Sequence, residues 1–210
     1  MRDDQRSTTQ EVVGKLKFME TFEQGNFDEK KLIEIVKPYF SSTREGDWEH
    51  ALRVVRWVKK LGLGRSDLHL LITAAYIHDI GWSGIAPKGK VADLNKMLEL
   101  EPLANANSHK LVSKVLSKLQ FTESEIETVN RLVAAADQHQ SNQEDEEIIV
   151  DADQLSKLCV EHLQDKYDPS QFLKFLNKWK TEFPNRMKTL KGKKLYPNLL
   201  ADLERKVIKN

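Results

Sequence analysis

The sequence has a single cysteine, Cys159, among its 210 residues, and this scarcity excludes an internal disulfide framework. It has no apolar run long enough to span a membrane, and no apolar stretch follows its charged first residues as in a signal peptide. Lysine and arginine (33) nearly balance aspartate and glutamate (32), so no excess charge draws the chain to nucleic acid or to an anionic membrane. We therefore expect a cytoplasmic protein in a reducing compartment.

Alternating strand patterns, internal repeats and low-complexity segments are also missing, and the apolar residues instead recur at helical spacing. Hydrophobic residues make up 40% of the chain and charged residues 31%, which suits a sizeable core with a well-solvated surface. We expect an all-α fold, a helical bundle forming one domain over residues 1–210. Its core would cover about 27–165, with additional helices at 8–25 and 166–210.

The expected helices follow from apolar periodicity and from capping residues. An amphipathic helix over 11–22 precedes a helix over 29–40, which Asp28 or Asn26 caps. The remaining expected helices cover 47–61, 67–79, 91–100, 109–119 (after Pro102 and a Ser108 cap), 122–139 (opened by a capping box), 148–163 and 170–190, with a terminal helix after Pro197.

The most informative stretch reads Ala74-Ala75-Tyr76-Ile77-His78-Asp79-Ile80-Gly81. The residues before His78 are apolar nearly all the way round, so we expect a helix buried within the domain. An imidazole and a carboxylate at its end need a partner that offsets their desolvation, and the negative end of the helix dipole favours a cation there. A satisfied buried histidine beside a C-terminal aspartate is the simpler alternative, and it would be preferred for a lone His-Asp pair.

Further metal-ligand residues fall at the ends of other expected helices, and several helices of a bundle can bring their ends to one point. Imidazoles and carboxylates without a thiolate suit iron, manganese, zinc, cobalt or nickel rather than calcium or magnesium. Two ions sharing one carboxylate would use the whole set, which is too large for a single ion with an open position. Taken singly, each of the others could be a surface or capping residue, and we interpret His69 and His162 as structural. The set predicts one metal centre, formed by His50, His78, Asp79, His109, His139 and Asp151.

Three segments together resemble the HD superfamily of metal-dependent phosphohydrolases: His50-Ala-Leu-Arg-Val, Ala-Ala-Tyr-Ile-His78-Asp79-Ile-Gly, and Val150-Asp151-Ala-Asp-Gln-Leu. The similarity covers about residues 45–160, and His-Asp-Ile-Gly is its most specific element. His109 and His139 resemble the extra histidines of the branch that binds two metals. The resemblance implies an all-α HD-domain bundle and a site for one or two divalent metal ions, iron or manganese before zinc, cobalt or nickel. It also implies hydrolysis of phosphate esters or anhydrides, often of nucleotides.

The resemblance assigns four residues to the first metal: His50, His78, Asp79 and Asp151. Asp79 would bridge to a second ion held by His109 and His139, and Asp153 would be a spare carboxylate. A hydroxide shared by the two ions would attack phosphorus in line with the leaving group.

Three basic residues are candidates for binding the substrate phosphate. Arg53 lies one helical turn from His50, and it could equally form a surface salt bridge. Lys88 and Lys90 are further candidates, because they lie in the expected loop 82–90, which its glycines would allow to act as a lid.

Basic residues also gather late in the chain. Between Lys174 and Lys194, eight basic side chains stand against Glu182 alone. A charge run of this kind usually forms a solvated face, which we prefer here over an anion-attracting patch.

The expected substrate is a small phosphorylated molecule such as a nucleotide. Cyclic dinucleotides are disfavoured because Trp82 stands where that class has lysine and no Gly-Tyr-Pro follows. Gln140, after His139, likewise weakens a diadenosine polyphosphate assignment. A di-iron oxygenase of the same fold, acting on a small organic or phosphonate substrate, is the alternative, because it needs the same ligands. A regulatory module with a degenerate site is least favoured, because all six ligand positions are filled.

Overall fold

The structure, a computed structural model, describes residues 23–24, 27–90 and 94–208. Within these ranges the chain forms nine α-helices and one minimal antiparallel strand pair, β1 (Glu23–Gln24) with β2 (Phe27–Asp28). This confirms the all-α fold predicted from the sequence. The helix predicted over 11–22 lies outside the described residues. None of the described helices is both long and apolar enough to cross a membrane.

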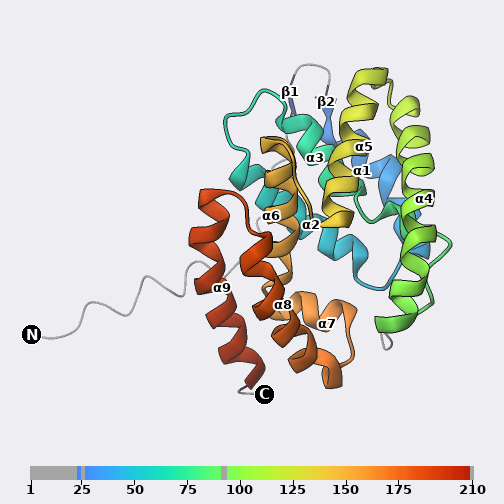
Figure 1. Cartoon of the computed structure of the whole chain (residues 1–210). Helices are drawn as coiled ribbons and strands as arrows, with labels where there is room; N and C mark the ends of the chain where they lie inside the picture. Colours follow the sequence, from blue (N-terminus) through green and yellow to red (C-terminus); the bar gives the residue numbers. More distant parts are fainter. Residues whose placement is uncertain (1–22, 25–26, 91–93, 209–210) are drawn as a thin grey trace, which may run out of the picture.

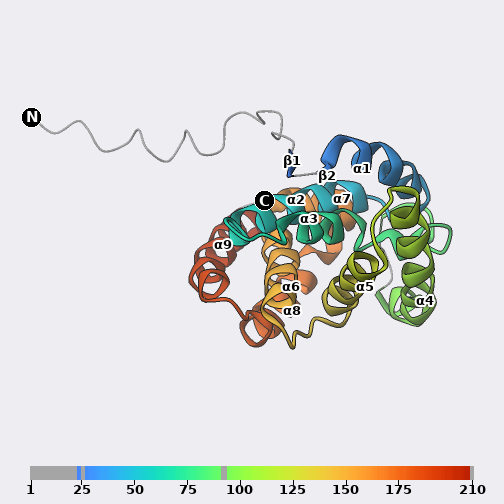
Figure 2. The same cartoon turned by 90° about the horizontal axis from the view of Figure 1, so that it is seen from above.

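The helices pack as a bundle in which α2, α3 and α6 lie between two outer groups (Figures 1 and 2). One outer group contains α4 and α5, and the other contains α8 and α9. The helices are α1 (Glu29–Val36), α2 (Asp47–Leu61), α3 (Leu68–Ile77), α4 (Leu94–Lys118), α5 (Glu123–Gln138), α6 (Glu144–Lys157), α7 (Val160–Lys166), α8 (Phe172–Arg186) and α9 (Leu190–Ile208), with short 3₁₀ turns η1 (Lys37–Ser42), η2 (Ile80–Trp82) and η3 (Pro169–Gln171).

Several predicted boundaries are confirmed because local capping chemistry determines them. Helix α2 has the predicted bounds. The Asp28 side chain accepts a hydrogen bond from the Lys31 backbone N–H at 3.1 Å, so Asp28 is the N-cap of α1. Thr122 and Glu125 form the predicted capping box at the start of α5.

Helix α4 departs from the prediction, because it runs unbroken through Pro102 where two separate helices were expected. Tertiary contacts account for the difference. The middle of α4 packs so closely on η2 that a Cβ on Gly81 would lie 2.3 Å from the Ala104 carbonyl oxygen. The Asn107 side chain also donates a hydrogen bond to the Gly81 carbonyl at 2.8 Å. These contacts outweigh the backbone hydrogen bond that proline cannot make.

Helix α6 begins four residues before its predicted start, because Glu144–Glu147 form an acidic first turn that suits a helix N-terminus. It ends at Lys157, and the predicted continuation to residue 163 is a separate helix, α7. Asp151 therefore lies in the middle of a helix. Asp153 follows two residues later, about 200° further round the axis, so the two carboxylates face different sides.

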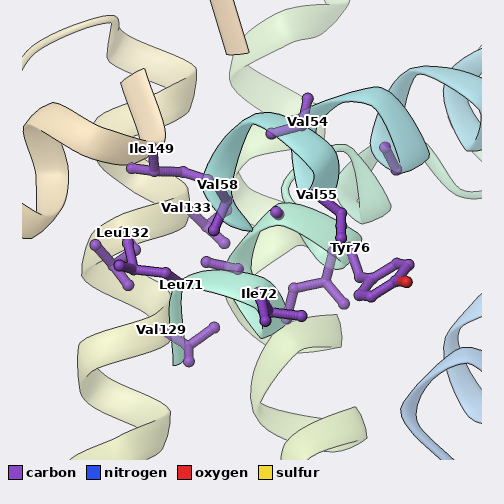
Figure 3. Packing of buried hydrophobic residues seen from close by; sticks show 14 of the residues in the cluster. Val54, Val55, Val58, Leu71, Ile72, Tyr76, Val129, Leu132, Val133 and Ile149 are labelled. Carbon is purple, nitrogen blue, oxygen red and sulfur yellow. The ribbon is translucent and has the colours of Figure 1, made fainter. Parts of the chain in front are cut away.

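Two apolar clusters hold the bundle together. The larger joins α1–α3 to α4–α6 and includes the fully buried Val55, Ile72 and Ile149 (Figure 3). The smaller joins the end of α6 to α7–α9, around Trp179 and Phe183. Helices α2 and α6 contribute side chains to both clusters, and their polar residues face the space between them.

Candidate metal centre

The local structure of α2 and α3 fixes three of the predicted ligands. Helix α2 starts after Gly46, whose positive φ of 77° and close approach to Asp165 leave no room for a side chain. One turn later, His50 is 2% exposed. At the other end of the site, His78 is the C-cap of α3, and Asp79 follows it at the negative end of that helix dipole.

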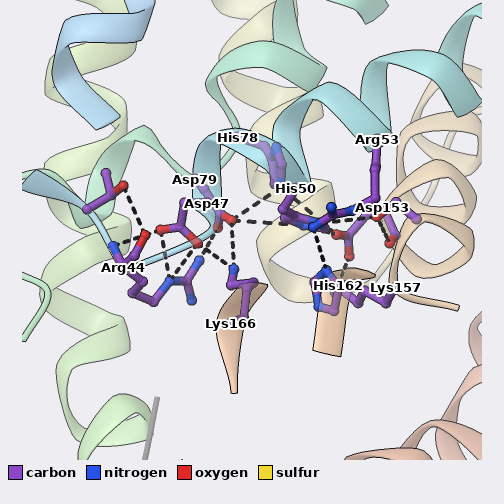
Figure 4. A network of polar contacts seen from close by, with 12 residues as sticks. Arg44, Asp47, His50, Arg53, His78, Asp79, Asp153, Lys157, His162 and Lys166 are labelled. Atoms are coloured by element: carbon purple, nitrogen blue, oxygen red, sulfur yellow. Dashed lines mark hydrogen bonds and ion pairs between the residues drawn. The ribbon is translucent and has the colours of Figure 1, made fainter. Parts of the chain in front are cut away.

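The ligand atoms of His50, His78 and Asp79 all lie within 4.8 Å of one another. The Asp79 Oδ2 atom lies 3.6 Å from His78 Nε2 and 3.9 Å from His50 Nε2. Figure 4 shows the two imidazoles and the carboxylate directed toward a common point. These three predicted residues are therefore brought together.

The second carboxylate at this point belongs to Asp153, which is 3% exposed. Its Oδ1 atom lies 3.1 Å from His50 Nε2 and 3.9 Å from His78 Nε2. The two histidines thus lie within reach of one carboxylate from the segment after α3 and another from α6.

The structure does not bring Asp151, the predicted ligand from this segment, to the two histidines. Its carboxylate accepts hydrogen bonds from the backbone N–H groups of Lys188 and Thr189, both at 2.8 Å, and from the Thr189 hydroxyl at 2.6 Å. Asp151 therefore holds the segment that begins α9, on the side of α6 away from the histidines. Asp151 and Asp153 lie on different sides of α6, so the orientation of this helix determines which of them faces the histidines. The sequence pattern placed the start of the helix at residue 148, four residues too late.

A hydrogen bond at the far side of the His78 imidazole leaves its Nε2 lone pair facing the site. The His78 Nδ1 atom lies 2.9 Å from the Ala75 carbonyl oxygen, which can only accept, so Nδ1 carries the proton. The Ser156 hydroxyl lies 3.1 Å from His50 Nδ1. The His78 Nε2 and Asp79 Oδ2 atoms are buried without a hydrogen-bond partner, which is where a bound cation would satisfy them.

These residues fit one divalent transition-metal ion. Ligand atoms bound about 2.0–2.2 Å from one ion lie roughly 3.0–3.5 Å from each other. The separations of the two imidazole nitrogens from the Asp79 and Asp153 oxygens run from 3.1 to 3.9 Å. To bind one ion, the ligand atoms of His50, His78 and Asp79, which lie within 4.8 Å of one another, would have to draw closer around it.

Electrostatics place these groups in the ionisation states that metals bind. Burial lowers the pKa of His50 well below its usual value, despite the hydrogen bond with Asp153, so the ring is neutral. Burial opposes ionisation of Asp79, but Arg44 and His78 outweigh it and hold the pKa of Asp79 well below its usual range. Burial also opposes ionisation of Asp153, but Lys157 and His50 outweigh it and hold the pKa of Asp153 well below its usual range. The site therefore presents neutral imidazole and ionised carboxylates.

Two cations that the sequence interpretation missed contact Asp79 and Asp47. The Arg44 guanidinium lies 2.5 Å from Asp79 Oδ1 and 3.1 Å from Asp47, and it stacks 4.2 Å from the centre of the Trp82 ring. Lys166 pairs with the fully buried Asp47, and its Nζ atom lies 3.6 Å from Asp79 Oδ2. The spacing of Arg44, Asp47 and His50 at three-residue intervals is the sequence signal that could have indicated Arg44.

On the opposite side, Lys157 Nζ lies 2.6 Å from Asp153 Oδ2, one helical turn along α6. His162, interpreted from the sequence as structural, is fully buried with its ring centre 4.8 Å from that of His50. Burial lowers the pKa of His162 well below its usual value. His69, the other histidine set aside, lies elsewhere in the fold, 3.7 Å from Glu125.

The two histidines expected to hold a second ion are not part of this cluster. His139 lies at its edge, with Nδ1 3.1 Å from the Gln154 side-chain nitrogen and 3.8 Å from Asp153 Oδ2. Burial and Lys157 lower the pKa of His139 to about 3. His109 is exposed on α4 and lines a separate cavity of about 160 Å³. Within the described residues, the structure does not bring His109 to Asp79.

The predicted phosphate-binding residues also lie away from the centre. Arg53 donates a hydrogen bond to Asp165 at 2.7 Å and lies 3.5 Å from His162 Nδ1, so the salt-bridge alternative describes it. Lys88 and Lys90 are exposed. None of the three lines the cavity at the metal-ligand cluster.

The cavity at the cluster has a volume of about 140 Å³ and is polar. Besides the four ligand candidates, Arg44, Lys157 and Lys166 line it, and so does Asp137. Burial and the nearby Asp79 raise the pKa of Asp137 well above its usual value.

In comparisons with known proteins, the chain matches no family model, no curated protein and no solved structure. The functional assignment therefore depends on the chemistry of the site and on the motif resemblance.

Proposed function

We propose that the protein is a metal-dependent phosphohydrolase that cleaves a phosphate ester or anhydride of a small molecule. The observation that carries this proposal is the convergence of His50, His78, Asp79 and Asp153 in a buried cavity lined by three basic side chains. A divalent transition metal ion, iron or manganese in the first place, would be held by these four residues. The resemblance of the His-Asp-Ile-Gly segment to HD-superfamily enzymes points to the same chemistry.

When bound, the ion would polarise a phosphoryl oxygen and lower the pKa of a coordinated water. The chain's own residues would position the substrate. Arg44 has guanidinium donors beyond those it uses on Asp47 and Asp79, and its stacking on Trp82 limits its orientations. Lys157 adds a second positive charge at the cavity. Both would hold the non-bridging phosphate oxygens and offset charge that develops as the bond breaks.

The third basic side chain at the cavity, Lys166, would have a structural role. It is 4% exposed and paired with the fully buried Asp47. Because this pair anchors α7 to the start of α2, Lys166 keeps the wall of the cavity in place and adds its charge beside Asp79.

The proposal specifies one ion. The di-iron oxygenase alternative needs a second ion held by His109 and His139, and neither histidine lies within the cluster. No observation in the structure favours that alternative. A degenerate regulatory module is disfavoured by the two imidazoles and two carboxylates that still face each other.

Metal analysis and a substrate screen test the proposal together. Purified protein should contain about one equivalent of a transition metal after incubation with manganese or iron and removal of excess. It should then hydrolyse members of a panel of phosphomonoesters, phosphodiesters and nucleotides, with and without oxygen. Activity that requires oxygen would favour the oxygenase, and substantially less than one equivalent of metal would overturn the proposal.

A further inference from the structure

The cavity at the metal-ligand cluster continues into a second cavity of about 180 Å³, and together they form a groove. Helix α8, from the smaller apolar cluster, lines the far part of this groove, together with Met97 and Leu98 at the start of α4. The two cavities share six lining residues: Arg44, Trp82, Glu101, His139, Lys157 and Tyr167. A substrate bound at the cluster would therefore extend along α8.

The far part of the groove carries excess positive charge. Of the charged residues that line only this far part, Lys178 and Arg186 are basic and Glu182 is acidic. Trp179 and Phe183 of α8 supply apolar surface between the charges. This composition favours an anionic group attached to an apolar body.

Lys178 is the basic residue that lacks a partner. It is partly buried, and among the described residues it forms no ion pair. Its neighbours differ: Lys180 pairs with Glu204 and Arg186 with Glu182, both at 2.8 Å. An anion in the groove would supply the counter-charge that Lys178 lacks.

Lys178 and Arg186 act on the same space as the cluster. Both line the second cavity together with His139 and Lys157, which also line the cavity at the cluster. The two basic residues lie about two turns apart on α8. This distinguishes them from the exposed Lys174, Lys193 and Lys194, which form the solvated face expected from the sequence.

We propose that the substrate carries two anionic groups, the scissile phosphate at the metal-ligand cluster and a second phosphate or carboxylate held by Lys178 and Arg186. This inference rests on the proposed phosphohydrolase function and specifies its substrate class. Analogues lacking the second anionic group would bind the near part of the groove only.

Matched substrate pairs test the second anion site. Adenosine 3′,5′-bisphosphate against 5′-AMP adds a phosphate, and 3-phosphoglycerate against glycerol 3-phosphate adds a carboxylate. In at least one pair, the manganese-loaded protein should show about tenfold higher kcat/KM for the doubly anionic member, the effect of one charge-assisted contact. Lys178→Gln should reduce this ratio to near one, while Lys174→Gln, an exposed change on the same helix, should leave it intact.

Calorimetric titration of the same pairs separates the two proposals. If no compound is hydrolysed but the doubly anionic member binds more tightly and Lys178→Gln abolishes that preference, the phosphohydrolase proposal fails and the second anion site stands. Equal kcat/KM and equal affinity within both pairs would overturn the second anion site. A preference that survives in Lys178→Gln would also overturn it. Arg186→Gln provides a second variant, with a smaller loss expected because Glu182 already uses part of its charge.

Discussion

Two regions of the molecule carry histidines that the sequence assigned to one metal centre, and the structure treats them differently. Around His50 and His78, the imidazoles are buried, oriented by hydrogen bonds from behind, and faced by carboxylates. Around His109, the imidazole is exposed and lies in a separate cavity beside Asp137. Because a metal ligand needs a fixed, neutral donor atom close to others, the first region supports an ion and the second does not.

The largest expected effect separates these two regions directly. His78→Ala removes a donor atom at the cluster and should lower kcat/KM by at least about 1000-fold, with loss of bound metal. His109→Ala should retain the metal and change kcat/KM less than about threefold. Metal content and kinetics of the two purified variants measure the contrast. Equal losses in both variants would restore the two-ion centre.

The next prediction compares the two aspartates of α6. Asp153→Asn should weaken metal binding by at least about 10–100-fold, because the amide is a poorer ligand beside His50. Asp151→Asn should keep the metal and lower the free energy of unfolding by about 1–2 kcal/mol, because it weakens the cap of α9. Competition with a metal chelator and denaturant unfolding measure the two quantities. Loss of metal from Asp151→Asn alone would reverse the assignment.

Arg44 lines the cavity and Arg53 does not, so substitutions of these two arginines should affect different quantities. Arg44→Gln removes a guanidinium that lines the cavity, so kcat/KM should fall about 10–100-fold, the value of one or two charged hydrogen bonds. Arg53→Gln breaks the contact with Asp165 and should reduce stability by about 1 kcal/mol with little change in kcat/KM. Steady-state kinetics and thermal unfolding distinguish these outcomes, and a larger kinetic loss in Arg53→Gln would contradict the cavity description.

The contact between α4 and η2 can be tested through the free energy of unfolding alone, without an activity measurement. Gly81→Ala would place a methyl group against the Ala104 carbonyl and should lower the free energy of unfolding by about 2 kcal/mol. Leu103→Ala, an exposed change on the same helix, should stay within about 0.5 kcal/mol of the wild type. Denaturant unfolding measures both. A Gly81→Ala variant as stable as wild type would show that α4 can move away from η2.

The smallest effect is expected at the exposed lysines of the 82–90 segment. Lys88→Gln and Lys90→Gln should each change kcat/KM less than about twofold, because neither side chain lines the cavity. A larger fall measured at physiological ionic strength would mean that this segment closes over the substrate.

Much of the fold could be predicted from local patterns. The apolar stretch before His78 predicted a buried helix, and capping residues placed the starts of α1 and α5. Pro102 gave the wrong boundary, because contacts between Asn107 and the Gly81 carbonyl are formed by residues distant in sequence. Local patterns report propensity, and tertiary packing overrides it where the two disagree.

The same distinction between local patterns and tertiary contacts applies to the residues of the candidate site. The sequence by itself determined the all-α class and the association of His50 with the His78–Asp79 pair, because both follow from periodicity and a short motif. Only the tertiary structure decided for Asp153 over Asp151, and it alone brought Arg44 and Lys166 to the carboxylates. The physical reason is that helix phase and the packing of helix ends depend on contacts across the whole bundle, and no neighbouring residues in the sequence encode them.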